Sequence, residues 1–353
     1  MRCDTLKLME LIIHKVALSL IHSIKAAHSE TDLRPTILLE LVLDDVSLWS
    51  EAPAFIQPNY MPETHDLLWE RLQVMGADIL AAFVADQVDN LLGKLQQFPI
   101  LSSAIDMLYC QWDARNQQQS LADYFDILPR QVLGSAMIGF LDSNMAYMER
   151  LEQLKASGYT AVKFKVDPDH IDDLQPILTH SLDLFESVCV DANGSFSPSN
   201  IQRLAQIPEL VVIEQPTLHT PFLMQLVRTL PHQILLDESI RSLSDLDSFS
   251  GTGVGVMLKP VCLGGLRLTL QYIQRCFELG IPCGISGYLD SGVGRYFQWL
   301  LAQHSQCLLR ADFVWSGYYF KKDVMTISSD RKLADPFRVD LSGFEVQSRQ
   351  FSR

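Results

Sequence analysis

Five charged residues recur at the carboxyl ends of short apolar runs, one strand–helix unit apart. They are Lys165, Asp191, Glu214, Asp237 and Lys259, and they are separated by 26, 23, 23 and 22 residues. In a parallel barrel the carboxyl ends of all strands meet on one rim, so side chains repeated at this interval converge on one site. An open doubly wound sheet would gather fewer of them, and no Gly-rich dinucleotide fingerprint follows a strand. The spacing therefore predicts a (β/α) barrel.

The apolar runs themselves supply the strands of this barrel. Each is short and is followed by a stretch with helical spacing, which is the order that builds parallel strand–helix units. We expect strands at residues 132–140, 161–166, 188–190, 211–213, 234–236, 254–258 and 282–285.

The chain before the barrel has a different pattern. Runs rich in Ile, Val and Leu at residues 7–20 and 36–43 predict early strands, with the polar segment 25–34 as the loop between them. Apolar residues three or four apart predict helices at residues 65–83, 87–98 and 102–115. We therefore expect an α+β domain at 1–125, the barrel at 126–315, and a segment at 316–353 that returns to the first domain, with a strand-like piece at Val324–Ile327.

Charge and cysteine content exclude several classes of partner. A formal net charge of -14 would repel nucleic acid and anionic membrane surfaces, and no Lys/Arg run offsets it. The seven cysteines form no CxxC pair, which favours reduced thiols over disulfides or a zinc site. Without a signal peptide or a membrane-spanning stretch, the sequence predicts a cytoplasmic protein that acts on a small molecule. A homo-oligomer is left open.

Three of the five rim residues are carboxylates on consecutive strands. Asp191, Glu214 and Asp237 would repel one another strongly if they were left unpaired. A hard divalent cation removes that repulsion, and an all-oxygen ligand set favours Mg²⁺ over zinc or copper. The sequence therefore predicts a magnesium site.

The lysines predict proton transfer. Lys163 and Lys165 point to the same face of one strand, because side chains alternate with period two, and Lys259 falls across the barrel mouth from them. A nearby cation and a second ammonium both favour the neutral form of a lysine, which can then act as a base. Such a base could remove a proton next to a carboxylate whose enolate charge is stabilised at the metal.

Several motifs resemble those of the enolase superfamily, and within it the muconate-lactonizing-enzyme-like group that contains o-succinylbenzoate synthases and N-acylamino acid racemases. The likeness extends over residues 6–334. Its motifs are Lys163-Phe164-Lys165, Asp191-Ala192-Asn193, Glu214-Gln215-Pro216, Asp237-Glu238-Ser239, Lys259-Pro260 with Gly264-Gly265, and two stretches outside the site at 58–64 and 287–295.

The resemblance implies a fold and a set of roles. The fold would be α/β, a modified TIM barrel of (β/α)7β form with an N-terminal α+β capping domain. The metal would be Mg²⁺, with Mn²⁺ as a substitute, and Lys165 would be the general base with Lys259 opposite it. The implied metal ligands are Asp191, Glu214 and Asp237, and Lys163 and Asn193 would position the substrate carboxylate. Further candidates for substrate binding are Ser135 and Ser286, which lie at strand ends, and Gly287. Ordinary capping explains the two serines equally well.

Two reactions fit these residues. A synthase would use Lys165 alone to dehydrate a hydroxycyclohexadiene carboxylate to o-succinylbenzoate in menaquinone synthesis, whereas an N-acylamino acid racemase or dipeptide epimerase needs both lysines. Racemising relatives typically carry Lys-Pro-Gly-Arg-x-Gly-Gly, but this chain has Cys262 in place of the arginine. The missing positive charge beside Lys259 favours dehydration. A catalytically silent barrel is disfavoured, because all six charged site residues are present, namely Lys163, Lys165, Asp191, Glu214, Asp237 and Lys259.

Overall fold

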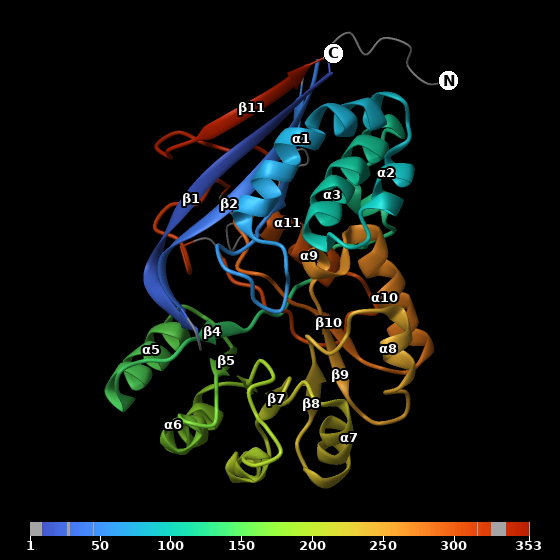
Figure 1. The fold of residues 1–353 in the computed structure, drawn as a ribbon. Helices are drawn as coiled ribbons and strands as arrows, with labels where there is room; N and C mark the ends of the chain where they lie inside the picture. Colours follow the sequence, from blue (N-terminus) through green and yellow to red (C-terminus); the bar gives the residue numbers. More distant parts are fainter. Residues whose placement is uncertain (1–8, 27–28, 45, 316, 326–336, 353) are drawn as a thin grey trace.

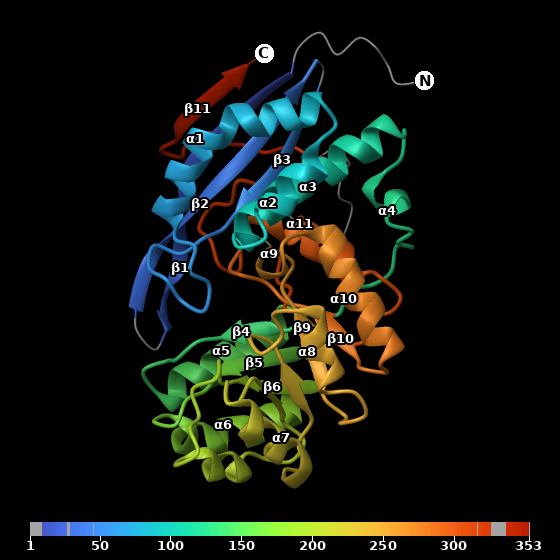
Figure 2. The ribbon, with the colours of Figure 1, turned by 45° about the vertical axis from the view of Figure 1, so that its right-hand side comes forward.

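Two β-sheets organise the chain in the computed structural model, which describes residues 9–26, 29–44, 46–315, 317–325 and 337–352. One is antiparallel, with strand order β11-β1-β2-β3, and the other is parallel, with order β10-β9-β8-β7-β6-β5-β4. They form two layers, with the antiparallel sheet and its helices lying over the barrel (Figures 1 and 2).

The antiparallel sheet carries helices on one face. Its strands are β1 (Met9–Ala26), β2 (Ser29–Leu43), β3 (Val46–Ala52) and β11 (Gln347–Ser352), and the helices that follow are α1 (His65–Val84), α2 (Val88–Lys94), α3 (Pro99–Asn116) and the short α4 (Leu121–Tyr124). The three longer helices lie where the sequence predicted them. Buried Leu, Ile, Phe and Trp side chains of the sheet and of α1 and α3 form the core between them.

The prediction of a loop over residues 25–34 was wrong for most of that segment. Strands β1 and β2 pair as far as Ala26 and Ser29, after a register shift between Ser19 and Ile24. Asp32 and Leu33 in this end of the hairpin are exposed to solvent. A strand with solvent-exposed residues need not show an apolar run, so its sequence resembles a loop.

The barrel strands follow the predicted order and are all parallel. They are β4 (Ala136–Ile138), β5 (Ala161–Lys165), β6 (Ser187–Asp191), β7 (Val212–Glu214), β8 (Ile234–Leu236), β9 (Gly255–Leu258) and β10 (Cys283–Ile285). The helical segments between and after them are α5 (Asn144–Ala156), α6 (Ile171–Leu184), η1 (Ile201–Gln206), α7 (Thr220–Thr229), α8 (Leu243–Asp247), α9 (Pro260–Leu263), α10 (Leu266–Glu278) and α11 (Gly292–Ala302).

Residues 309–312 occupy the eighth position of the ring. Leu309 and Asp312 donate backbone hydrogen bonds to Cys283 and Ile285 of β10, at 3.0 and 2.9 Å. On the other side Ala311 donates to Leu133 at 2.9 Å, just before β4. This segment joins the two edges of the seven-stranded sheet, which confirms the modified barrel with an N-terminal capping domain.

The C-terminal segment differs in detail from the prediction. Val324 and Met325 form a bend rather than the predicted strand, and residues 326 and 327 lie outside the described part of the chain. The last strand is β11, which pairs antiparallel with β1. The polar sequence of β11 gave no apolar alternation from which to predict it. The domain boundaries at 125 and 315 stay a prediction.

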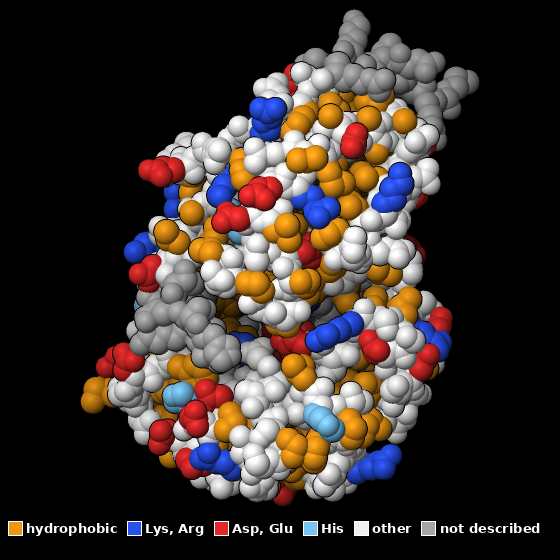
Figure 3. All heavy atoms as spheres, in the orientation of Figure 1, with side chains coloured by type: hydrophobic (Ala, Val, Ile, Leu, Met, Phe, Trp, Pro, Cys, Tyr) orange, Lys and Arg blue, Asp and Glu red, His pale blue; other side chains and the backbone are white. Residues whose placement is uncertain are grey.

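Two further observations concern the length of the helices and the distribution of charge on the surface. No helix in the described ranges is long and apolar enough to cross a membrane. On the face drawn in Figure 3, acidic and basic side chains lie interspersed across both layers.

Two buried charges of the capping sheet bind the segment that follows β10. Arg34, 1% exposed, donates to the carbonyls of Tyr288 and Leu289 at 3.0 and 3.1 Å. Glu51 accepts from the backbone N–H groups of Ser291 and Gly294, at 3.0 and 2.9 Å, at the start of α11. The capping sheet thus fixes the chain next to the barrel rim.

Glu51 makes this contact sensitive to pH. Burial, followed by the charge of Asp290, raises the pKa of Glu51 to about 7 from 4.5. Because the folded pKa lies above the unfolded one, the stability that this group contributes is full below about pH 4.5 and is lost as the pH rises through 7. We expect the free energy of unfolding to fall between pH 5 and pH 8, relative to Glu51→Gln, by up to about 3 kcal/mol. Urea unfolding of both proteins measures the difference, and parallel pH curves would contradict the prediction.

Candidate active site

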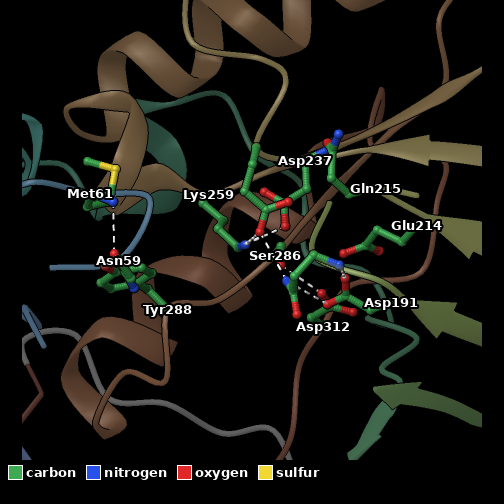
Figure 4. Close-up of polar contacts among 12 residues, drawn as sticks. Asn59, Met61, Asp191, Glu214, Gln215, Asp237, Lys259, Ser286, Tyr288 and Asp312 are labelled. Carbon is green, nitrogen blue, oxygen red and sulfur yellow. Dashed lines mark hydrogen bonds and ion pairs between the residues drawn. The ribbon is translucent and has the colours of Figure 1, made fainter. Parts of the chain in front are cut away.

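Three carboxylates stand side by side at the carboxyl ends of β6, β7 and β8. Asp191 is the register partner of Glu214, and Glu214 is the partner of Leu235, two residues before Asp237. All three are buried, with exposed fractions of 3%, 0% and 6% respectively. They converge with Lys259 at the barrel mouth (Figure 4). The regular spacing along the sequence therefore corresponds to one cluster.

Each carboxylate is paired with a lysine. Lys165 Nζ lies 2.8 Å from Asp191 Oδ2, Lys163 Nζ lies 2.6 Å from Glu214 Oε2, and Lys259 donates to Asp237 Oδ2. Within the described residues, no group of three His, Cys, Asp or Glu side chains is arranged to hold a metal ion. The three acids are thus satisfied by ammonium groups from β5 and from the end of β9.

The carboxylates differ in their electrostatic surroundings. Burial opposes ionisation of Asp191, but Lys165, Lys163 and Lys259 lower its pKa to about 2. Burial and the neighbouring Glu238 raise the pKa of Asp237 to about 7, and burial raises the pKa of Glu214 well above its usual value. The other oxygen of Glu214, Oε1, is buried with no hydrogen-bond partner among the described residues. A buried acceptor without a donor, near two more carboxylates, has the ligand chemistry of a hard divalent cation site, although the acids are paired with lysines in this arrangement.

Asp312 belongs to the site, although the sequence analysis missed it. Its Oδ2 accepts a hydrogen bond from Lys163 and another, at 2.7 Å, from Ser286 Oγ. Burial lowers the pKa of Lys163, but the charges of Asp312 and Glu214 outweigh this effect. The pKa of Lys163 therefore lies well above its ordinary value. Lys163 and Ser286 are therefore brought together on one acceptor. A short apolar run, Cys307 to Leu309, precedes Asp312, but Arg310 interrupts that run, so the local sequence did not mark Asp312 as a site residue.

Asn193 and Gln215 fix the loops that follow β6 and β7. Both have left-handed backbones, with φ of 42° and 38°, which is uncommon for residues other than glycine. The Asn193 N–H donates to Asp191 Oδ1 at 2.9 Å, and the Asn193 Oδ1 accepts from Lys165. Gln215, which belongs to a motif but had no predicted role, accepts from the backbone N–H of Asp237 at 2.8 Å. These two loops thus orient Asp191, Lys165 and Asp237.

The capping domain reaches the site through the segment around Tyr60. Lys259 Nζ lies 4.9 Å from the centre of the Tyr60 ring, within the range of a cation–π contact. Beside it Tyr288 donates to Asn59 Oδ1 at 2.8 Å (Figure 4). Burial lowers the pKa of Lys259, but Asp237, Tyr60 and Glu238 raise it well above its ordinary value. Lys259 is therefore enclosed from both domains.

Of the two remaining predicted residues, Ser135 lies before the amino end of β4 and Gly287 lies after the carboxyl end of β10. Ser135 precedes β4 and donates its backbone N–H to Ala311 at 3.0 Å. Gly287 follows Ser286, and an added Cβ there would come within 3.1 Å of Gln298 Oε1. A larger residue at this position would require the Gln298 side chain to shift.

A parallel barrel with carboxylates and lysines gathered at its carboxyl rim, under an α+β cap, defines an enolase-type enzyme. The family described as Enolase C-terminal domain-like matches residues 146–343. The chain belongs to this family, in the mandelate racemase/muconate-lactonizing subgroup of the enolase superfamily.

This chain is similar to relatives that are named for two different activities. An o-succinylbenzoate synthase of Enterococcus faecalis is 27% identical over 79% of this chain and 78% of its own length. An N-succinylamino acid racemase of Amycolatopsis is 24% identical over 90% of this chain and 89% of its own. At such identities either activity is plausible for a chain with this fold.

Solved structures of the superfamily have the same fold. A member from Listeria innocua superposes with a TM-score of 0.84 at 20% identity, covering 98% of each chain. A dipeptide epimerase from Enterococcus faecalis, complexed with Mg and the dipeptide L-Leu-L-Tyr, superposes with a TM-score of 0.78 at 19% identity, over 92% of this chain and 96% of its own. Members of the family thus bind magnesium and small-molecule substrates.

Proposed function

We propose that this chain is an o-succinylbenzoate synthase, a hydro-lyase. It would dehydrate 2-succinyl-6-hydroxy-2,4-cyclohexadiene-1-carboxylate to o-succinylbenzoate with Mg²⁺ or Mn²⁺. Several of the similar relatives carry that name, and Cys262 stands where racemising relatives have an arginine. A cytoplasmic location and any homo-oligomer remain predictions.

The observation that carries the proposal is the unequal exposure of the two opposed lysines. The Lys165 side chain is 29% exposed, whereas the Lys259 side chain is 9% exposed beneath Tyr60. A syn dehydration needs one accessible group that first takes and then returns a proton, whereas racemisation needs two groups that exchange protons with one carbon. The asymmetry supports the reaction with one base.

The three acids have the oxygen chemistry that Mg²⁺ requires, but each is paired with a lysine here, so entry of the metal would have to displace those ammonium groups. Asp191, Glu214 and Asp237 would hold the Mg²⁺, and the oxygen of Glu214 that has no partner would gain one. A bound divalent cation supplies Lewis-acid stabilisation of the negative charge that develops on the substrate carboxylate.

Lys165 would carry out both proton transfers. Its neutral amine takes the α-proton, and the resulting ammonium delivers that proton to the departing hydroxyl, so that the C–O bond breaks, water leaves and the ring becomes aromatic. Lys163 and Asn193 would orient the carboxylate, and the ammonium of Lys259 would stabilise the enolate by charge alone. Ser135, Ser286 and Gly287 stay proposed substrate contacts.

Ultraviolet-monitored turnover of the cyclohexadiene substrate tests the proposal. We expect rapid loss of the diene absorbance with Mg²⁺, and no loss after excess chelator is added. Absence of turnover at any metal concentration would reject the synthase.

The second candidate is an N-acylamino acid racemase or dipeptide epimerase, favoured by the presence of both lysines at one site. Incubation of N-succinyl-L-phenylalanine and its D-enantiomer in deuterated water separates the two activities. We expect exchange of the α-proton of the enantiomer that faces Lys165, with slower exchange of the other, because Lys259 is more enclosed. Equal and fast exchange of both enantiomers, with interconversion, would establish the racemase instead.

A further inference from the structure

Glu238 is a buried carboxylate that the mechanism above leaves unused. It directly follows Asp237 after β8, and 6% of the residue is exposed. Its Oε1 accepts a hydrogen bond from Asn193 Nδ2 at 3.1 Å and lies 3.6 Å from Lys259 Nζ. Its Oε2 is buried and has no hydrogen-bond partner among the described residues. Burying a carboxylate costs free energy, so we expect the buried Glu238 to have a role in the site.

A single oxygen of Glu238 is connected to both opposed lysines. Lys259 is in direct ionic contact, and Lys165 is reached through Asn193, whose Oδ1 accepts from the Lys165 ammonium. The Asn193 amide cannot move freely, because its left-handed backbone donates to Asp191 while its side chain bridges Lys165 and Glu238. Displacement of Glu238 would therefore change the positions of both Lys259 and Lys165.

We propose that Glu238 is a positioning residue that sets the places of the two lysines, Lys259 directly and Lys165 through Asn193. The inference rests on the proposed function, in which the lysines lie on opposite faces of one carbon atom. Reacting atoms must approach to about 3–3.5 Å, and a displacement of about 1 Å can cost about 100-fold in rate. One rigid carboxylate that contacts both sides would keep that separation fixed.

Three variants and a control test the positioning role of Glu238 in the deuterium-exchange assay with the two enantiomers of N-succinylphenylalanine. Glu238→Ala should slow exchange at both faces by about 10- to 100-fold, mainly in kcat and with little change in KM. Glu238→Gln retains the shape and one acceptor oxygen, so we expect it to restore most of that rate. Asn193→Ala should slow the exchange that Lys165 carries out more strongly than the exchange at Lys259, where only the contact of Asn193 with the substrate carboxylate is lost.

The matched control is Glu63→Gln. Glu63 is also buried, at 1% exposed, but it accepts from the backbone N–H groups of Ile100 and Leu101, in the capping domain. We expect exchange rates close to those of the parent. A Glu238→Ala variant that loses no more than this control, or that changes KM alone, would overturn the proposal.

Crystal structures of the parent and of Glu238→Ala separate this inference from the proposed function. We expect Lys259 Nζ and the Asn193 amide to move by about 1 Å or more in the variant. If both stay in place, Glu238 does not position them. If the parent neither dehydrates nor exchanges, the proposed function fails, and the two structures still decide the role of Glu238.

Discussion

Replacement of Lys165 by alanine is expected to lower kcat by at least about 10³-fold, because one side chain serves as both base and acid in the proposed dehydration. Lys165 is the more exposed of the opposed lysines and its Nζ lies 2.8 Å from Asp191. The change also removes a cation from a buried carboxylate. Loss of activity could then arise from a disturbed site rather than from a lost base.

Lys165→Arg separates these causes. A guanidinium can still pair with Asp191, but it is not deprotonated in proteins and so cannot act as a base. We expect this variant to be as inactive as Lys165→Ala while it melts close to the parent temperature. Lys94→Ala, an exposed lysine at the end of α2, serves as the neutral control. Substantial turnover by Lys165→Arg would rule out the role of this lysine in proton transfer.

Much of the barrel could be predicted because its strands are short, apolar and end in charged side chains. The runs ending near Lys165, Asp191 and Glu214 needed no long-range information, since each strand carries its own signal. The clustering of these residues followed from one topological rule, that parallel strands share a carboxyl edge. The sequence therefore located the centre of the site.

What could not be predicted depends on contacts between segments far apart in the chain. Asp312 lies in the site because residues 309–312 bond to both sheet edges, and nothing in its local sequence distinguishes it from a loop acid. Tyr60 reaches Lys259 only through the placement of the capping domain. Strand β11 is polar, so only its pairing with β1 defines it. Such contacts are set by tertiary packing, which overrides local propensity.

The pairing of every rim carboxylate with a lysine has a consequence for catalysis. Asp237 and Glu214 each contribute to raising the pKa of a lysine, Lys259 and Lys163 respectively. A group that competes for those carboxylates would weaken this effect and make proton release from the lysines easier. Metal binding and lysine reactivity should therefore be coupled in this site.

Removal of one carboxylate should abolish the response to magnesium. Ligand at about 100 times its dissociation constant stabilises a folded protein by about 2.7 kcal/mol, so Mg²⁺ should raise the melting temperature of the parent by several degrees. Glu214→Gln keeps the shape and one oxygen for Lys163 but loses the charge, so we expect no Mg²⁺-dependent rise and at least about a 10³-fold loss of turnover. Thermal unfolding with Mg²⁺ and with chelator measures the first effect.

Glu63→Gln again provides the comparison, because it neutralises a buried carboxylate away from the rim. It should respond to Mg²⁺ as the parent does. If Glu214→Gln and Glu63→Gln respond alike, the metal does not bind at Glu214 and the proposed ligand set is wrong. If only Glu214→Gln fails to respond, the carboxylates at the ends of β6, β7 and β8 act as one ligand set, and their lysine partners must exchange position or protonation when the metal enters.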